Sequence, residues 1–267
     1  MEAALAQDLE IARSAARKGS EVIRPWLGSL HGADFKGEVD PVTEIDRRSE
    51  ALVITAIKTV RPNDAILAEE SGGDPLGLDR VWIIDPLDGT VNFLHGVPHV
   101  GVSVALYERG LPRVGVVVDV FRDETFTAAA GAGAFRNGEQ ILVSNQADLG
   151  AALVATGFPY DRRRRAAPYA AIVGEMLTHV QGLRRMGTAS LDLAWVACGR
   201  YDAFWELQLA PWDVAAGILL VQEAGGQTTD LTGALARPGD PAVVASNVAL
   251  AEEFRGRVAA AIPSGLI

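Results

Sequence analysis

Residues 82–90, Trp82-Ile83-Ile84-Asp85-Pro86-Leu87-Asp88-Gly89-Thr90, form the stretch that says most about the fold. An apolar run typical of a buried strand leads into two aspartates three positions apart. Because an ionised carboxylate is costly to bury without a partner, this placement indicates a functional site. The Asp-Gly-Thr end can begin a helix whose free amide groups suit a phosphate, and hard oxygen ligands favour Mg²⁺. The alternative is a surface turn, but a bare turn does not require an apolar strand before it.

Acidic residues recur at two further points beside predicted strands. Glu69 and Glu70 directly follow the strand-like run Ala65–Ala68, and taken alone they are typical of a solvated pair of acids. Glu206 ends another predicted strand, and Asp213 opens a predicted helix. Taken alone, an aspartate at the start of a helix is explained by N-capping without any further role. The three acidic segments together favour a metal site over these separate structural explanations.

Hydrophobic periodicity predicts an α-rich beginning and two different halves. Helices are expected from about residue 5 to 26 and from about Thr43 to Pro62, with a loop at 28–37 between them. In the first half we expect strands at 65–68, 81–84, 100–107, 114–120 and 124–129, with Asn137-Gly138 as a hairpin turn before 141–143. Beyond residue 147 we expect strands at 152–155, 183–186, 203–206 and 242–245, alternating with helices at 168–179, 190–198, 213–224 and the C-terminus. This predicts one domain, 1–267, in which an α/β half (147–267) packs on a more antiparallel α+β half (1–146).

Composition narrows the class of protein. The chain has 267 residues, of which 49% are hydrophobic and 22% charged, as expected of a globular protein. The net charge of −10 disfavours nucleic acid and anionic membranes as partners, and bound divalent cations would reverse the local sign at a phosphate site. No signal peptide and no apolar run of ~18 residues is present, so a cytoplasmic enzyme is predicted.

Five segments give the sequence a specific resemblance. They are Asp40-Pro41-Val42-Thr43-Glu44-Ile45-Asp46, Glu69-Glu70-Ser71, Trp82 through Phe93, Gly187-Thr188-Ala189, and Pro211-Trp212-Asp213 with the following Glu223-Ala224-Gly225-Gly226. In order, spacing and total length the chain resembles the inositol monophosphatase family of magnesium-dependent, lithium-sensitive phosphatases. The resemblance covers nearly the whole chain. It implies an α/β fold with five αβαβα layers, of the inositol monophosphatase and fructose-1,6-bisphosphatase type, and a homodimer.

The resemblance also implies a metal centre of two or three Mg²⁺ ions. Glu69, Asp85 and the carbonyl of Leu87 would hold the first ion, and Asp85, Asp88 and Asp213 would hold the second. The implied catalytic set is Asp46, Glu69, Glu70 and Thr90. The implied substrate contacts are Asp88, Gly89, Thr90, Gly187, Thr188, Ala189, Glu206 and Asp213.

Within the catalytic set, Asp46 and Thr90 would orient and activate the attacking water, and Glu70 would assist a third, weaker ion. Asp46 has a second explanation, because Thr43-x-x-Asp46 also matches a helix capping box. The two roles are compatible. No Ser, Cys or His nucleophile motif is apparent, which favours direct attack by water over a phosphoenzyme.

The expected activity is hydrolysis of inositol 1-phosphate to myo-inositol and phosphate. Neighbouring branches act on fructose 1,6-bisphosphate, histidinol phosphate or 3′-phosphoadenosine nucleotides, and these remain alternatives. A non-catalytic binding protein on the same fold is a further alternative, with the run Arg162–Arg165 meeting an acidic partner. That run is more typical of a solvated loop, but it or Arg184 and Arg185 can also reach a substrate phosphate.

Overall fold

The structure is a computed structural model that describes residues 2–29, 34–35, 41–73 and 79–267. Asp40 and most of the loop predicted at 28–37 lie outside the described residues. Within that loop the prediction was wrong at two residues, because Asp34–Phe35 (β1) pairs antiparallel with Pro41–Val42 (β2). A two-residue strand is too short to produce a detectable period.

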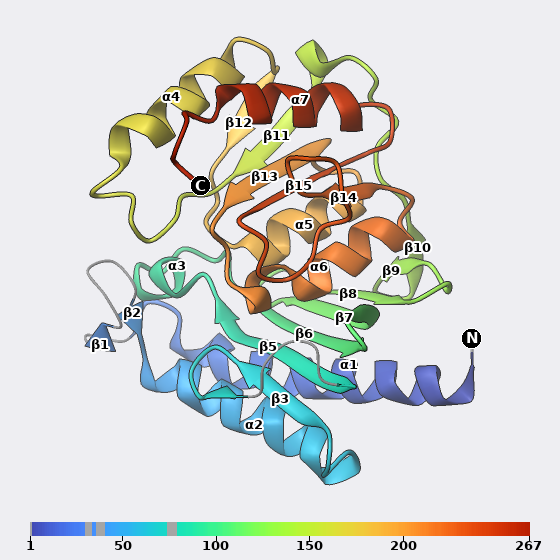
Figure 1. Ribbon diagram of the computed structural model, residues 1–267. Coiled ribbons are helices and arrows are strands. Elements are labelled where there is room, and N and C mark those ends of the chain that lie inside the picture. The colour runs from blue at the N-terminus through green and yellow to red at the C-terminus, as the bar shows by residue number, and fades with distance from the viewer. Residues whose placement is uncertain (1, 30–33, 36–40, 74–78) are drawn as a thin grey trace.

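Five layers of helices and sheets are stacked, as predicted (Figure 1). The first layer holds α1 (Ala3–Ile23), which continues as the 3₁₀ turn η1 (Arg24–Trp26), and α2 (Glu44–Val60). These helices cover one face of an eight-stranded sheet with the order β10-β9-β8-β7-β6-β5-β3-β4. Its strands are β3 (Ala65–Ala68), β4 (Gly72–Gly73), β5 (Arg80–Asp88), β6 (Gly101–Glu108), β7 (Leu111–Asp119), β8 (Glu124–Ala129), β9 (Ala134–Arg136) and β10 (Glu139–Ile141).

The other face of this sheet meets a middle layer of two helices. They are α5 (Ala189–Ala197) and α6 (Pro211–Glu223), and the short helix α3 (Thr90–Leu94) lies at the edge of the stack. A five-stranded sheet follows, with the order β12-β11-β13-β15-β14. Its strands are β11 (Leu153–Thr156), β12 (Gly182–Arg184), β13 (Ala203–Leu207), β14 (Gln227–Thr229) and β15 (Ala242–Ser246). The last layer holds α4 (Ala166–Leu177) and α7 (Ala251–Ala261), and η2 (Leu149–Ala151) precedes β11.

Strand β5 is buried on both faces, which explains its unbroken apolar run. Val81 and Ile83 belong to the core against α5 and α6, whereas Trp82 and Ile84 belong to the core against α1 and α2. Alternate side chains of a strand point to opposite faces, so a strand between two helical layers is apolar throughout. The third core lies between the second sheet and α4 and α7.

The end of β5 differs from the prediction. The strand was expected to stop before Asp85, but it continues to Asp88, and its register with β6 shifts between these two residues. Pro86 lies within the shift, and a proline, which has no N–H for a ladder hydrogen bond, is tolerated in a strand at such an irregularity. Both aspartates are therefore held by a sheet rather than by a loop.

Strand β14 was not predicted, since its three residues are too few to give a strand period. The remaining predicted helices and strands are present with shifted ends. Among the described residues, no helix combines the length and apolar character needed to cross a membrane.

Candidate metal centre and active site

The carboxyl end of β5 opens into a pocket of about 110 Å³. Its lining comes from segments far apart in the sequence: the turn after β3, β5 and the start of α3, the loops after β11 and β12, and the segment from β13 to α6. The lining residues predicted from the sequence are Glu69, Asp85, Leu87, Asp88, Gly89, Thr90, Gly187, Ala189, Glu206 and Asp213.

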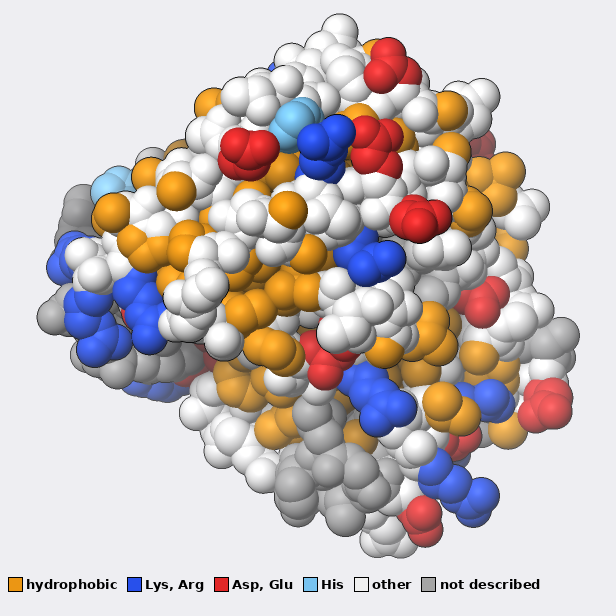
Figure 2. All heavy atoms as spheres, turned by 45° about the horizontal axis from the view of Figure 1, so that its top comes forward, with side chains coloured by type: hydrophobic (Ala, Val, Ile, Leu, Met, Phe, Trp, Pro, Cys, Tyr) orange, Lys and Arg blue, Asp and Glu red, His pale blue; other side chains and the backbone are white. Residues whose placement is uncertain are grey.

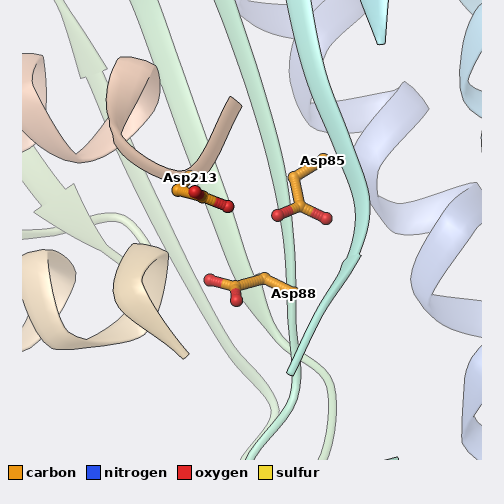
Figure 3. Close-up of side chains that lie close together, drawn as sticks. All are labelled: Asp85, Asp88 and Asp213. Atoms are coloured by element: carbon orange, nitrogen blue, oxygen red, sulfur yellow. The ribbon is translucent and has the colours of Figure 1, made fainter. Parts of the chain in front are cut away.

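Three aspartates converge at the inner end of this pocket. Asp85 and Asp88 extend from β5 and Asp213 from the first turn of α6, and their side chains point toward one another (Figure 3). One carboxylate oxygen of each lies within 4.8 Å of the others. The sequence places Asp213 125 residues after Asp88, so the fold alone creates this group.

The electrostatics of the group call for cations. Burial is the main cause that raises the pKa of Asp85 well above its usual range, and the charges of Glu69 and Asp88 add to it. Burial followed by the charges of Asp88 and Glu69 raises the pKa of Asp213 in the same way. Without cations these carboxylates repel one another and resist ionisation. A cluster of hard anionic oxygens in a water-accessible pocket fits Mg²⁺. Bound there, Mg²⁺ supplies charge neutralisation for a phosphate and lowers the pKa of water.

Backbone donors hold two of the aspartates in place. The amide of Ser190, in the first turn of α5, donates to Oδ2 of Asp88 at 2.7 Å. The amide of Ala210 donates to Oδ2 of Asp213 at 2.7 Å. Asp213 is the third residue of α6 and Ala210 is the N-cap, so the alternative explanation of Asp213 as an N-cap does not hold. Pro211 begins the helix, where its missing N–H costs nothing.

The backbone of Leu87 contacts both Asp85 and Thr90. The amide of Leu87 donates to Oδ1 of Asp85 at 3.1 Å, and its carbonyl lies 3.2 Å from the Thr90 hydroxyl. Leu87 itself is 1% exposed, so only its backbone is available to the pocket. Gly89 has φ +95°, which few residues other than glycine adopt, and this turn starts α3 beside Leu87.

Asp46 and Thr90 are brought together, as the resemblance implied. The Thr90 hydroxyl donates to Oδ1 of Asp46 at 3.0 Å. The amide of Thr43 donates to Oδ2 of the same carboxylate at 2.9 Å, and the Thr43 hydroxyl donates to it as well. Asp46 thus completes the capping box of α2 and at the same time accepts from Thr90, which lines the pocket; Asp46 itself lies behind Thr90 and is not a lining residue. Burial raises its pKa to about 6, against the lowering effect of these hydrogen bonds.

The two glutamates after β3 have different surroundings. Glu69 lines the pocket, and its charge acts on Asp85 and Asp213. The charge of Glu70 acts on Asp46. The amide of Glu70 donates to Oε2 of the buried Glu50 at 2.8 Å, so α2 positions this turn. Sequence reasoning missed Glu50, since one acid on an amphipathic helix gives no signal.

The predicted substrate side is formed by α5 and β13. Gly187 and Ala189 line the pocket. Thr188 is 1% exposed, and its hydroxyl donates to the carbonyl of His99 at 2.9 Å. Glu206 lies at the pocket wall with 8% exposure, and burial raises its pKa to about 8, although the charge of Arg185 opposes this.

Several lining residues were not assigned from the sequence. They are Val91, Phe158, Pro159, Tyr160, Gln208 and Leu209. Arg162 and Arg185, for which a substrate contact was one of two explanations, also line the pocket. Neutral residues in loops have no periodicity or charge pattern that marks them as part of a site.

Comparison with known proteins agrees with this geometry. The inositol monophosphatase family model matches residues 4–264. Nus factor SuhB of Pseudomonas aeruginosa is 46% identical over 84% of this chain and 86% of its own length, and an inositol-1-monophosphatase of Rhizobium meliloti is 42% identical over 86% and 87%. The solved inositol monophosphatase of Anabaena superposes with a TM-score of 0.87 at 39% identity, covering 97% of both chains.

The fold and the acidic pocket therefore define a protein of the phosphatase class. The chain belongs to the inositol monophosphatase family.

Proposed function

We propose that this chain hydrolyses inositol 1-phosphate to myo-inositol and phosphate with two or three Mg²⁺ ions. The observation that carries the proposal is the convergence of Asp85, Asp88 and Asp213 within 4.8 Å in a pocket that also holds Thr90. Family membership supports the phosphatase class. Glu69 and the carbonyl of Leu87 would complete the ligands.

The chain's own residues would divide the reaction between them. The Thr90 hydroxyl donates to Asp46, so its lone pairs can accept a hydrogen bond from the attacking water. Asp46, with a pKa of about 6, is ionised at neutral pH and can take up a proton as the water oxygen bonds to phosphorus. The ester bond breaks in the same step, and the alcohol oxygen leaves with the bonding pair and takes a proton from solvent water. Asp46 then returns its proton to solvent. The amides of Gly89 and Thr90 would hold the phosphate, and Glu206 would accept a hydrogen bond from a hydroxyl of the alcohol.

A panel of phosphate esters tests this proposal. We expect Mg²⁺-dependent release of phosphate, with the highest kcat/KM for inositol 1-phosphate among the panel of that ester, fructose 1,6-bisphosphate, histidinol phosphate and a 3′-phosphoadenosine nucleotide. Activity should vanish in chelator and return with Mg²⁺. Full activity in chelator, or no release from any ester, would refute it. A higher kcat/KM for another ester would replace only the substrate.

Three further properties belong to the same proposal. We expect a cytoplasmic homodimer that Li⁺ inhibits by replacing the more weakly held ion of the product complex. Sedimentation measures the association of two chains into a dimer, and inhibition kinetics measure the effect of Li⁺. A monomer at micromolar concentration would refute the dimer, and no effect of Li⁺ would refute the inhibition. Neither result would contradict the proposed metal site.

A second candidate function is binding to an acidic macromolecule. The Pseudomonas aeruginosa relative supports it, because the name Nus factor does not refer to an enzymatic activity. Arg163 and Arg164 are exposed in the loop before α4, and Figure 2 shows Lys and Arg side chains gathered at the side where this loop lies in Figure 1. Retention of the wild-type chain on immobilised heparin, lost when both residues become Gln, would support this function. No retention of the wild type would count against it, as the net charge of −10 predicts.

A further inference from the structure

Gly157 lies next to Glu206, the acid at the substrate side of the pocket. Strands β11 and β13 run parallel, and their register pairs Thr156 with Trp205. One residue further along, this register brings Gly157 beside Glu206. Paired residues of adjacent strands project their side chains to the same face of a sheet. A side chain at position 157 would therefore compete with the Glu206 side chain for the same space.

The carboxyl group of Glu206 packs against the backbone of Gly157, and both residues are buried. A Cβ at position 157 would overlap with both carboxyl oxygens of Glu206 and with the carbon that joins them, and these are the three atoms nearest to it. The carboxyl group thus covers the glycine as a whole and does not merely touch it with one atom.

The backbone conformation does not require a glycine at this position. Gly89 and Gly187, which line the same pocket, have φ values of +95° and +80°, where a side chain is strained. Gly157 does not have a positive φ, so other residues can adopt its conformation. The missing side chain at 157 is therefore explained by the space that Glu206 occupies and not by a turn of the chain.

Packing is what holds Glu206 in place. Asp88 and Asp213 each accept a hydrogen bond from a backbone amide, whereas among the described residues the carboxyl group of Glu206 has no such donor. The charge of Glu206 acts on the buried Asp192, and the charge of Asp88 acts on Glu206. A side chain at position 157 would push the carboxyl group toward these acids or into the pocket. In either case Glu206 leaves its place at the wall.

We infer that Gly157 is a positioning residue, which leaves the space that holds the Glu206 carboxyl group at the pocket wall, where it meets a hydroxyl group of the alcohol. The role toward the alcohol rests on the proposed function, but the packing of Glu206 on Gly157 does not depend on any activity. A methyl group at position 157 should weaken the binding of an alcohol that has further hydroxyl groups and spare an alcohol that has none.

Two esters separate this role from a general loss of activity. Inositol 1-phosphate offers hydroxyl groups to the wall, and phenyl phosphate offers none. We expect Gly157→Ala to raise KM for inositol 1-phosphate by about tenfold at unchanged kcat, since one hydrogen bond to the alcohol is lost, and to leave KM for phenyl phosphate unchanged. Gly174→Ala is the matched control for both esters, because Gly174 is exposed in α4 and a Cβ there would meet nothing within 4 Å.

A double variant gives a result that a merely structural role of Gly157 would not produce. Glu206→Ala alone should lower kcat/KM for inositol 1-phosphate by about the same factor as Gly157→Ala. Combining the two substitutions should cause no further loss, because the carboxyl group that overlaps with the new methyl group is gone. A full second loss in the double variant, or an equal loss for both esters in Gly157→Ala, would overturn the inference and leave the proposed function standing. Unchanged kinetics of Gly157→Ala would do the same.

Thermal unfolding in chelator tests the packing without any activity. Gly157→Ala should lower the unfolding temperature of the wild type by about 2–4 °C, and that of Glu206→Ala by less than about 1 °C. If the wild type releases phosphate from neither ester but shows this difference, the packing of Glu206 on Gly157 stands and the proposed function fails. Equal shifts in the two backgrounds would show that Glu206 is not what excludes a side chain at position 157, and the inference would be wrong.

Discussion

The carboxylate of Asp213 has two roles. Its Oδ2 accepts the Ala210 amide, which fixes the side chain, while the group as a whole faces Asp85 and Asp88. Asp88 is held in the same way by the Ser190 amide. Each aspartate is thus positioned before any ion binds. Burial is the main cause that raises the pKa of both, and for Asp213 the charges of Asp88 and Glu69 add to it. An amide in place of one carboxylate keeps the shape and removes the repulsion.

Asp213→Asn should therefore separate activity from stability. The Asn oxygen can still accept the Ala210 amide, but a weak neutral ligand replaces an anionic one. We expect kcat to fall by about 100-fold or more in Mg²⁺. In chelator the variant should unfold at a higher temperature than the wild type, because one buried negative charge is gone. Asp79→Asn, at a 93% exposed side chain, is the control for both measurements. Wild-type turnover of the variant would show that Asp213 binds no catalytic ion.

Glu206 should make the metal-free chain less stable as the pH rises. Its pKa is raised from 4.5 to about 8, mainly by burial. Between these values the folded chain keeps a proton that the unfolded chain has released, so the free energy of unfolding falls as the pH rises through this window. Glu206→Gln mimics the protonated acid and should flatten the wild-type curve between pH 4.5 and 8. Thermal unfolding in chelator across this range measures the difference. Parallel curves for the two chains would mean that Glu206 is ionised when folded.

At the scale of elements, the side-chain amide of Asn92 connects α3 to the segment that precedes α5. The Asn92 side-chain amide donates to the carbonyls of His99 and Met186, both at 2.9 Å, and lies 3.3 Å from the Thr188 hydroxyl. The Thr188 hydroxyl itself donates to the His99 carbonyl. Because Thr90 begins α3 and Thr188 precedes α5, these hydrogen bonds hold the starts of the two helices at a fixed distance across the pocket.

Asn92→Ala should loosen this connection without removing any group that contacts substrate. Two backbone carbonyls lose a donor, which costs about 1–3 kcal/mol in the free energy of unfolding. We expect KM to rise and kcat to fall together, since both sides of the pocket lose their relative position. Denaturant unfolding and steady-state kinetics check the two effects, with the exposed Asn63→Ala as the matched control. Loss of stability with unchanged kinetics would show that α5 is positioned without Asn92.

At the scale of the whole molecule, the fold was largely predictable because its layers follow from hydrophobic patterns. The uniform apolar run of β5 indicated a strand covered on both faces, and the structure places α1 and α2 on one side and α5 and α6 on the other. What could not be predicted depends on short or non-periodic segments. Strand β14 has three residues, and Phe158 and Tyr160 reach the pocket from a loop. The grouping of Asp213 with Asp85 and Asp88 could be anticipated only through resemblance to a family, since no local pattern relates residues so far apart.

The aspartate cluster links the first sheet to α6, and this leads to a prediction about stability. Asp85 and Asp88 belong to the first sheet, whereas Asp213 belongs to α6 in the second half. An ion that binds only this folded arrangement stabilises it by about 2.7 kcal/mol at 100 times its Kd. For a chain of this size the unfolding temperature should rise by on the order of 5–10 °C. Because the ligands bind Mg²⁺ only when ionised and their pKa values are raised, the rise should be larger at pH 8 than at pH 5.5.

Thermal unfolding with Mg²⁺, against Na⁺ at equal ionic strength, measures this stabilisation. The sodium control is needed because the net charge of −10 attracts any cation to the surface. Asp213→Asn should lose most of the Mg²⁺-specific rise, while Asp79→Asn should keep all of it, since Asp79 lies on the surface beside Arg109. An equal Mg²⁺-specific rise in the wild type and in Asp213→Asn would place the stabilising ions elsewhere. The three aspartates would then have no part in holding the first sheet to α6.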